Sequence, residues 1–216
     1  MRPGWQEAWF LALCFAAATA IFFLSEPARS RFSSLGLGAP PHLMLALATA
    51  LGTMAIMSLR RGGFFAPAKG SGLRKAAFWA ALVSPVIIVL DVARPFPAMM
   101  NQPWPDAWLF YPAIAVVAMA LLQLLPLALL FALTGRARLS VALAALPEAV
   151  MQTLIGAGPF DWQAAAVAGL VTVLGIAGMT LFRRYGILAL IAVRLGFYLG
   201  WNILWGAARL SLLPFP

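Results

Sequence analysis

The chain has 216 residues, of which 63% are apolar and only 10% are charged, with a mean hydropathy of +0.94 and a net charge of +9. A soluble domain is nearer half apolar and a quarter charged, so this composition excludes a water-soluble globule. The single Cys14 and single His42 exclude an intrachain disulfide, a bis-histidine haem and a zinc site built from histidines. We therefore expect no metal and no cofactor.

Seven apolar runs follow one another along the chain, and most are long enough to cross a hydrocarbon core of about 30 Å at 1.5 Å per residue. They cover residues 9–24, 43–59, 76–92, 108–133, 141–155, 164–182 and 187–205. The runs are continuous rather than alternating, which favours helices over barrel strands. The fifth run is short and contains Pro147 and Glu148, so it is the weakest candidate. We expect an all-α, polytopic transmembrane bundle of about seven helices, forming a single domain over residues 1–216.

The basic residues predict the orientation of these helices. If the helices alternate in direction, one side receives Arg2, Arg60, Arg61, Lys69, Arg74, Lys75, Arg136, Arg138, Arg183 and Arg184. The other side receives Arg29, Arg31, Arg94 and Arg209, together with Glu26, Asp91, Asp106 and Asp161. The positive-inside rule then places the N-terminus in the cytoplasm of a multi-pass protein of the inner membrane. Because the basic residues are dispersed over short loops, we expect the lipid bilayer as a partner and no nucleic acid.

Two charged residues lie deep inside apolar runs, where an ionisable group is costly unless it is paired or functional. Glu148 and Arg194 each lie about 10 to 12 Å from the cytoplasmic side, counted at 1.5 Å per residue. They can meet if the fifth and seventh helices are neighbours. One interpretation is a structural ion pair that fixes helix docking, and the other places Glu148 in an active or formerly active site.

Further polar residues predict a seam between the fourth, fifth and seventh helices. Gln152 follows Glu148 by one helical turn, and Gln123 lies at a similar depth on the fourth helix. On the seventh helix Arg194, Tyr198 and Asn202 form an i, i+4, i+8 stripe. Such a seam is either a set of interhelical hydrogen bonds, each worth about 1 kcal/mol, or part of a functional site.

The second half of the chain, over roughly residues 110–206, resembles the CAAX prenyl protease and bacteriocin-processing (CPBP, or Abi) family of intramembrane proteases. The segment from Pro147 to Gln152 is similar to the family motif Glu-Glu-x-x-x-Arg, with Pro for the first Glu and Gln for the Arg. The segments 110–113, 124–127, 182–187 and 197–206 resemble bacterial members. The resemblance implies water activation by a glutamate with the help of motif histidines. No histidine occurs in the third to seventh runs, however, and glutamine and asparagine cannot accept a proton near neutral pH.

These observations lead to two main functional hypotheses. The first is a non-catalytic accessory, assembly or binding subunit of a larger membrane complex, built on a protease-like scaffold. The alternative is an active intramembrane endopeptidase with Glu148 as general base and with Gln123, Gln152 and Asn202 positioning water or substrate. Transport of a small solute along the seam is a third possibility, which the single acid–base pair and the lack of an internal repeat disfavour.

Overall fold

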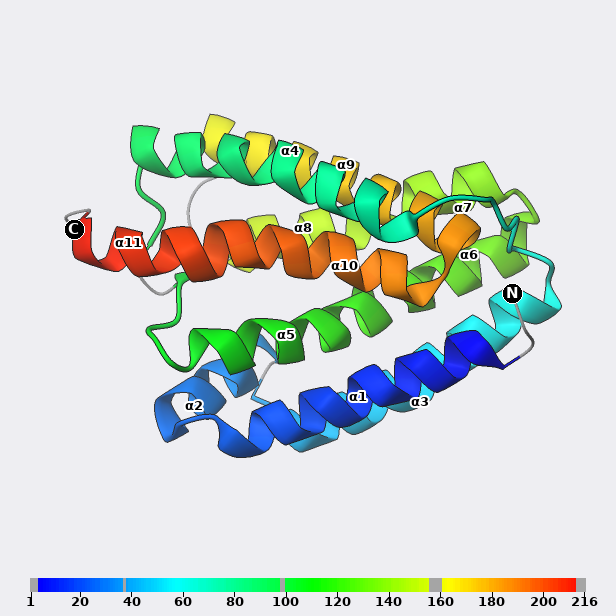
Figure 1. The fold of residues 1–216 in the computed structure, drawn as a ribbon, viewed down its shortest axis with the longest axis horizontal. Coiled ribbons are helices and arrows are strands. Elements are labelled where there is room, and N and C mark those ends of the chain that lie inside the picture. Colours follow the sequence, from blue (N-terminus) through cyan, green and yellow to red (C-terminus); the bar gives the residue numbers. More distant parts are fainter. Residues whose placement is uncertain (1–3, 37, 98–99, 156–160, 213–216) are drawn as a thin grey trace.

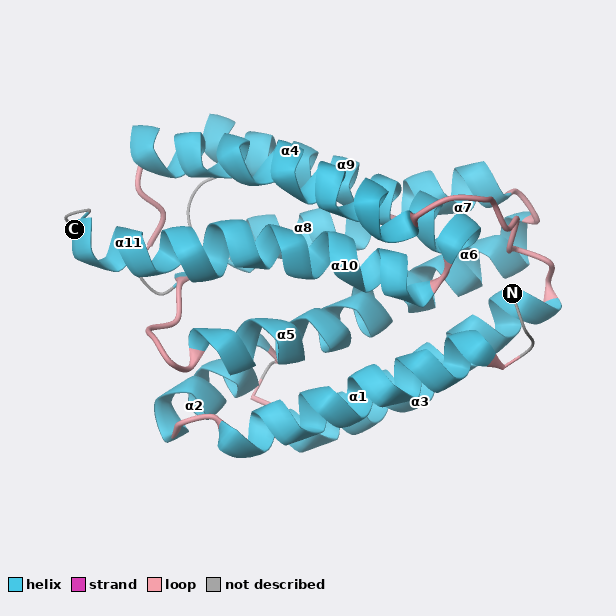
Figure 2. Ribbon diagram, in the orientation of Figure 1, coloured by secondary structure: helices cyan, strands magenta, loops and turns pink. Residues whose placement is uncertain are grey.

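A computed structural model describes residues 4–36, 38–97, 100–155 and 161–212. In these residues the chain is built from helices and loops, with no strand (Figure 2). Six helices are long and apolar enough to span a membrane. They are Trp5–Phe23, Pro41–Arg61, Gly72–Ala93, Ala107–Thr134, Trp162–Tyr185 and Ile187–Leu212. The protein is therefore a multi-pass helical membrane protein.

The long helices form one elongated bundle (Figure 1). Its elements are α1 (Trp5–Phe23), α3 (Pro41–Arg61), α4 (Gly72–Ala93), α5 (Ala107–Ala118) with its continuation α6 (Leu125–Thr134), α9 (Trp162–Tyr185), α10 (Ile187–Tyr198) and α11 (Gly206–Leu212). α1 packs on α3 and α5, while α10 packs on α4 and α9. α1 begins at one end of the bundle and α11 finishes at the opposite end.

Two of these long helices contain a π-helical segment. η2 (Met119–Leu124) joins α5 to α6, and η3 (Leu199–Trp205) joins α10 to α11. Gly196 and Gly200 allow the second of these helices to lie close to α4, because a Cβ atom at either position would come within 2.7 Å of Ala80 or Ser84. This is the close backbone approach that small residues provide in membrane helix pairs.

The fifth apolar run is divided into two short helices, α7 (Ala137–Ala144) and α8 (Leu146–Ile155). The break at Ala145 has a local cause, because Pro147 has no N–H to donate to the preceding turn and is tolerated only in the first turn of a helix. Neither piece alone has the length of a span, which is why six helices rather than seven meet that criterion. In Figure 1, α7 lies beside α6 at one end of the bundle, and α8 lies nearer its middle.

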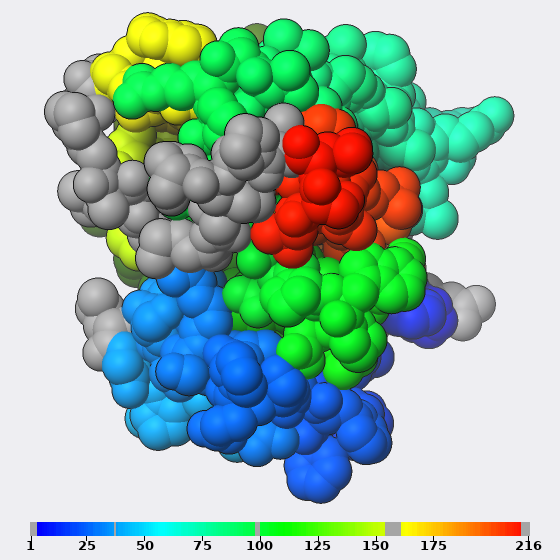
Figure 3. Space-filling view, turned by 90° about the vertical axis from the view of Figure 1, so that its left-hand side faces the viewer, coloured from blue at the N-terminus to red at the C-terminus, as the bar shows by residue number. Residues whose placement is uncertain are grey.

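A short helix, α2 (Glu26–Leu35), joins α1 to α3 and was not expected from the apolar runs. The Ser25 hydroxyl caps its first turn by accepting from the Ala28 N–H at 3.4 Å. Its fully buried Phe32 packs edge-to-face on Phe110, with ring centroids 5.6 Å apart. α2 is thereby fixed against the start of α5. Figure 3 looks onto this end of the bundle and shows α2 (blue), α5 (green) and α11 (red) side by side.

The opposite end of the bundle carries most of the basic residues. The loop between α3 and α4 pairs with the end of α9, since Ala66 N–H and Ala68 N–H donate to the carbonyls of Arg183 and Arg184 at 3.0 and 3.1 Å. Arg60 forms an ion pair with Glu7 near the start of α1, at 3.2 Å. The basic segments around residues 60–75 and 183–184 therefore gather at the end where α1 begins.

Candidate functional site

Glu148 on α8 and Arg194 on α10 form a buried ion pair in the bundle. The distance between Arg194 Nη2 and Glu148 Oε2 is 2.5 Å, and each side chain is only 8% exposed. The pairing predicted from their similar depth is confirmed. Because α8 and α10 both pack on α9, this contact joins two elements that share a neighbour.

Two further residues of the predicted seam contact this pair. Gln123 in η2 donates from Nε2 to Glu148 Oε2 at 2.8 Å, and Arg194 donates from Nη1 to the Tyr198 hydroxyl at 3.2 Å. Glu148 Oε2 therefore accepts a hydrogen bond from a neutral amide and one from a cation. An oxygen that holds two donors in this way has little lone-pair capacity left for a water molecule.

Both π-helical segments carry a predicted site residue. Gln123 lies in η2 and Asn202 lies in η3. Single π-turns inside α-helices are uncommon and occur often at functional sites. The wider turn of η3 changes the register beyond Tyr198, so the i, i+4, i+8 stripe is realised as a contact only in its first step, from Arg194 to Tyr198. Asn202 instead accepts at its backbone carbonyl from Asn101 Nδ2, at 3.4 Å.

A cavity of about 770 Å³ unites all the predicted site residues. It is lined by Gln123, Glu148, Gln152, Arg194, Tyr198 and Asn202. The remaining lining is mostly aliphatic and aromatic and comes chiefly from α3, α4, α5, α9 and α10, with further residues from α2, α8, the two π-helical segments and the segment after α4. Gln123, Glu148, Arg194 and Tyr198 contact one another, whereas Gln152 and Asn202 contribute to the same cavity from other parts of its wall. A volume of this size, apolar with a few convergent polar groups, is typical of small-molecule sites, which span about 300–1,000 Å³.

No family model, curated protein or solved structure matches this chain. Membership in the CPBP family therefore stays a prediction from the motifs. The chemistry of the site is defined by its own residues: His42, the single histidine, is exposed near the start of α3 and does not line the cavity. In the part of the chain that the structure describes, no three His, Cys, Asp or Glu side chains gather as metal ligands would.

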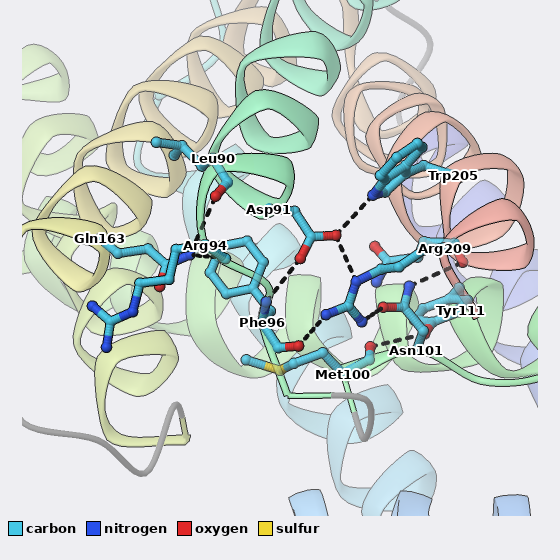
Figure 4. A network of polar contacts seen from close by, with 11 residues as sticks. Leu90, Asp91, Arg94, Phe96, Met100, Asn101, Tyr111, Gln163, Trp205 and Arg209 are labelled. Carbon is cyan, nitrogen blue, oxygen red and sulfur yellow. Dashed lines mark hydrogen bonds and ion pairs between the residues drawn. The ribbon is translucent and has the colours of Figure 1, made fainter. Parts of the chain in front are cut away.

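A second buried ion pair corrects the sequence interpretation of Asp91 and Arg209 (Figure 4). Both were expected among the charges of the outer side, but each side chain is 0% exposed, with 2.6 Å between Arg209 Nε and Asp91 Oδ2. Trp205 Nε1 donates to Asp91 Oδ2 at 2.7 Å, and the Phe96 N–H donates to Asp91 Oδ1 at 2.8 Å. The segment after α4 folds back and supplies backbone partners that a count of loop charges does not foresee. One sequence signal was present, because Asp91 lies inside the run 76–92.

Arg209 extends this network to the proline-rich segment between α4 and α5. Its Nη1 donates to Asn101 Oδ1 at 2.7 Å, and its Nη2 donates to the Phe96 carbonyl. The Tyr111 hydroxyl donates to the Met100 carbonyl at 3.1 Å. The segment thus lies against α5 and α11, and its four prolines disfavour a continuous helix across it.

A third contact ties this segment to α9. Arg94 pairs with Asp161, which precedes α9, and Gln163 Nε2 donates to the Arg94 carbonyl at 2.6 Å. The pKa of Asp161 is lowered, chiefly by the Ala164 N–H that donates to the carboxylate and next by Arg94. Arg94, Phe96 and Asp161 also line the cavity. The cavity wall at the end of α4 is therefore held by polar contacts from α4, α9 and α11.

Proposed function

We propose that this chain is a non-catalytic, membrane-embedded binding or accessory subunit. The observation that carries the proposal is the contact of Gln123 and Arg194 with the same oxygen of Glu148, in the wall of the 770 Å³ cavity. This arrangement gives the cavity a fixed polar cluster inside an apolar wall. It suits recognition of a bound group more than transfer of a proton.

Proton transfer by Glu148 would need a carboxylate free to bind and deprotonate water. Arg194 and Gln123 both donate to Glu148 Oε2, so that oxygen is already engaged by donors of the protein. Gln123 and Gln152 cannot accept a proton near neutral pH, and the single histidine lies elsewhere. The cavity therefore has polar groups that support binding, while the histidines that the CPBP motifs use for hydrolysis do not occur in the third to seventh apolar runs.

The proposed scaffold is a degenerate relative of the CPBP family with seven crossings of the inner membrane. In support, α7 and α8 run back from the end of α6, and we propose that together they make a fifth crossing between α6 and α9. Seven crossings place the two ends of the chain on opposite sides, in agreement with the positions of α1 and α11. The basic end, where α1 begins, would face the cytoplasm. Other membrane subunits are the partners that an accessory role implies.

The alternative is an active endopeptidase that uses Glu148. One observation favours it: Glu148 lines a cavity large enough for part of a substrate. Hydrolysis would then require Arg194 to leave the carboxylate when substrate binds.

Purification of the tagged, full-length protein from its native membrane in a mild detergent tests the proposal. We expect a stoichiometric membrane complex, or a lipid held by the purified chain, to persist through size-exclusion chromatography. Native mass spectrometry would identify either. A monomer that carries neither a partner nor a lipid would contradict the proposal.

A further inference from the structure

Four residues that line the cavity carry buried polar atoms that need a hydrogen-bond partner. Four buried polar atoms have no hydrogen-bond partner among the described residues: Gln123 Oε1, Arg194 Nε, Trp201 Nε1 and Asn202 Oδ1. Gln123, Arg194 and Asn202 are only 5%, 6% and 3% exposed. Buried polar atoms are normally satisfied, since leaving them unpaired is unfavourable. A molecule in the cavity that offers hydrogen-bonding groups would satisfy them.

Two of the four atoms are donors and two are acceptors. Beside Glu148, Arg194 Nε is a donor and Gln123 Oε1 is an acceptor. In η3, Trp201 Nε1 is a donor and Asn202 Oδ1 is an acceptor. Arg194 and Asn202 are about 12 Å apart along the helix axis at 1.5 Å per residue. A hydroxyl group both donates and accepts, so it can satisfy a donor or an acceptor of this set.

The charges around the cavity favour an uncharged ligand. Glu148 and Arg194 neutralise each other, and so do Arg94 and Asp161 in the cavity wall at the end of α4. A charged ligand group next to either of these ion pairs would lack a counter-charge of its own in a poorly hydrated site. Arg31 of α2 also lines the cavity, and a ligand that used it would be an anion.

We propose that the cavity binds a neutral hydroxylated lipid, with its hydroxyl accepting from Trp201 Nε1 and its chain along the apolar wall. That wall includes Leu47 and Leu51 of α3, Val83 and Ile87 of α4, and Leu190 of α10. The inference rests on the proposed binding function and names the class of ligand.

The test uses four probes that share an 18-carbon chain: oleyl alcohol, oleyl sulfate, oleyltrimethylammonium and 1-octadecene. Each is titrated into the full-length protein in maltoside micelles, and binding is followed by the thermal unfolding midpoint and by tryptophan fluorescence. We expect saturable binding of oleyl alcohol that is at least tenfold tighter than that of the other three probes. Equal binding of 1-octadecene would overturn the inference, because the hydroxyl would then contribute nothing. Tighter binding of oleyl sulfate would overturn it in favour of an anion at Arg31.

A matched pair of variants locates the hydroxyl. Trp201→Phe removes the Nε1 donor and keeps an aromatic ring, while Trp108→Phe makes the same change at a residue that does not line the cavity. We expect Trp201→Phe to weaken oleyl alcohol about three- to tenfold, the usual worth of one hydrogen bond, with 1-octadecene unaffected. Equal alcohol affinities of the two variants would overturn the assignment of the hydroxyl to Trp201.

The outcomes also separate this inference from the proposed function. Failure of all four probes, with a stoichiometric partner still bound to the native protein, would overturn the ligand class and leave the accessory role intact. Cleavage that depends on Glu148 would overturn the accessory role itself.

Discussion

The Glu148–Arg194 pair predicts a strong thermodynamic coupling. Arg194→Ala removes the 2.5 Å ion pair and the 3.2 Å hydrogen bond to Tyr198. It leaves the Glu148 carboxylate, whose side chain is 8% exposed, with Gln123 as its remaining hydrogen-bond donor. Glu148→Gln has the converse effect, because it leaves the buried guanidinium of Arg194 next to Tyr198 without its counter-charge.

The size of the effect follows from burial. Removing one partner of a buried ion pair costs about 3–5 kcal/mol, since the other charge stays in a poor solvent. The double variant Glu148→Gln, Arg194→Ala buries no charge at this position. Its loss of stability should therefore be smaller than the sum of the two single losses by about 2 kcal/mol or more.

The free energy of unfolding can be measured by titration with dodecyl sulfate in mixed micelles. Arg74→Ala is the control, because Arg74 is exposed, and its effect should stay within about 0.5 kcal/mol. Ordinary hydrogen bonds between membrane helices contribute about 0.6 kcal/mol on average, so a coupling of that size or less would contradict a strong Glu148–Arg194 interaction. Additive losses would mean that the two side chains act independently.

Three further predictions concern the rest of the bundle. Asp91→Asn should destabilise the protein by about 3–5 kcal/mol in the same titration, because Arg209, with 0% exposure, loses its counter-charge; an effect below about 1 kcal/mol would contradict this. Gly186→Ala should lower the free energy of unfolding by about 1–3 kcal/mol, because φ is +90° and ψ is −172° there and the new Cβ would lie 2.2 Å from Gln6 Nε2; a neutral change would show that α10 can shift at its start. The folded-state pKa of Asp161 is lowered, so its contribution to stability is present above the unfolded pKa of about 3.9 and is lost as the pH falls through the folded value. The difference in unfolding midpoint between the wild type and Asp161→Asn should therefore shrink below about pH 4, and a difference that grows there would contradict the sign.

The sequence predicted those parts of the fold that depend on single-residue energetics. Apolar runs located five of the six long helices to within four residues at each end, because burying a backbone in lipid requires continuous helices. The last helix begins where predicted but continues seven residues beyond residue 205, to Leu212. The cost of intramembrane charge identified Glu148 and Arg194, and their matching depth predicted their contact. The same reasoning placed Gln123 and Tyr198 beside them.

The remaining features depend on tertiary structure. The burial of Asp91 and Arg209 requires the segment after α4 to return with the Phe96 backbone, a contact that no periodicity encodes. The π-turns at Gln123 and Asn202 change the helical register, so a stripe drawn with 3.6 residues per turn stops being reliable beyond Tyr198. The cavity itself is formed where α2 to α5 and α8 to α10 pack together, so no single segment of sequence encodes it.

We propose that Glu148 stabilises the site and does not activate water. Hydrolysis of a quenched, fluorogenic hydrophobic peptide by the protein in liposomes tests it most directly, with the wild type and Glu148→Gln compared at equal folded amounts. We expect the wild type and Glu148→Gln to release fluorescence at the same rate as protein-free liposomes. Cleavage by the wild type that is lost in a folded Glu148→Gln protein would contradict the account and establish Glu148 as a catalytic base.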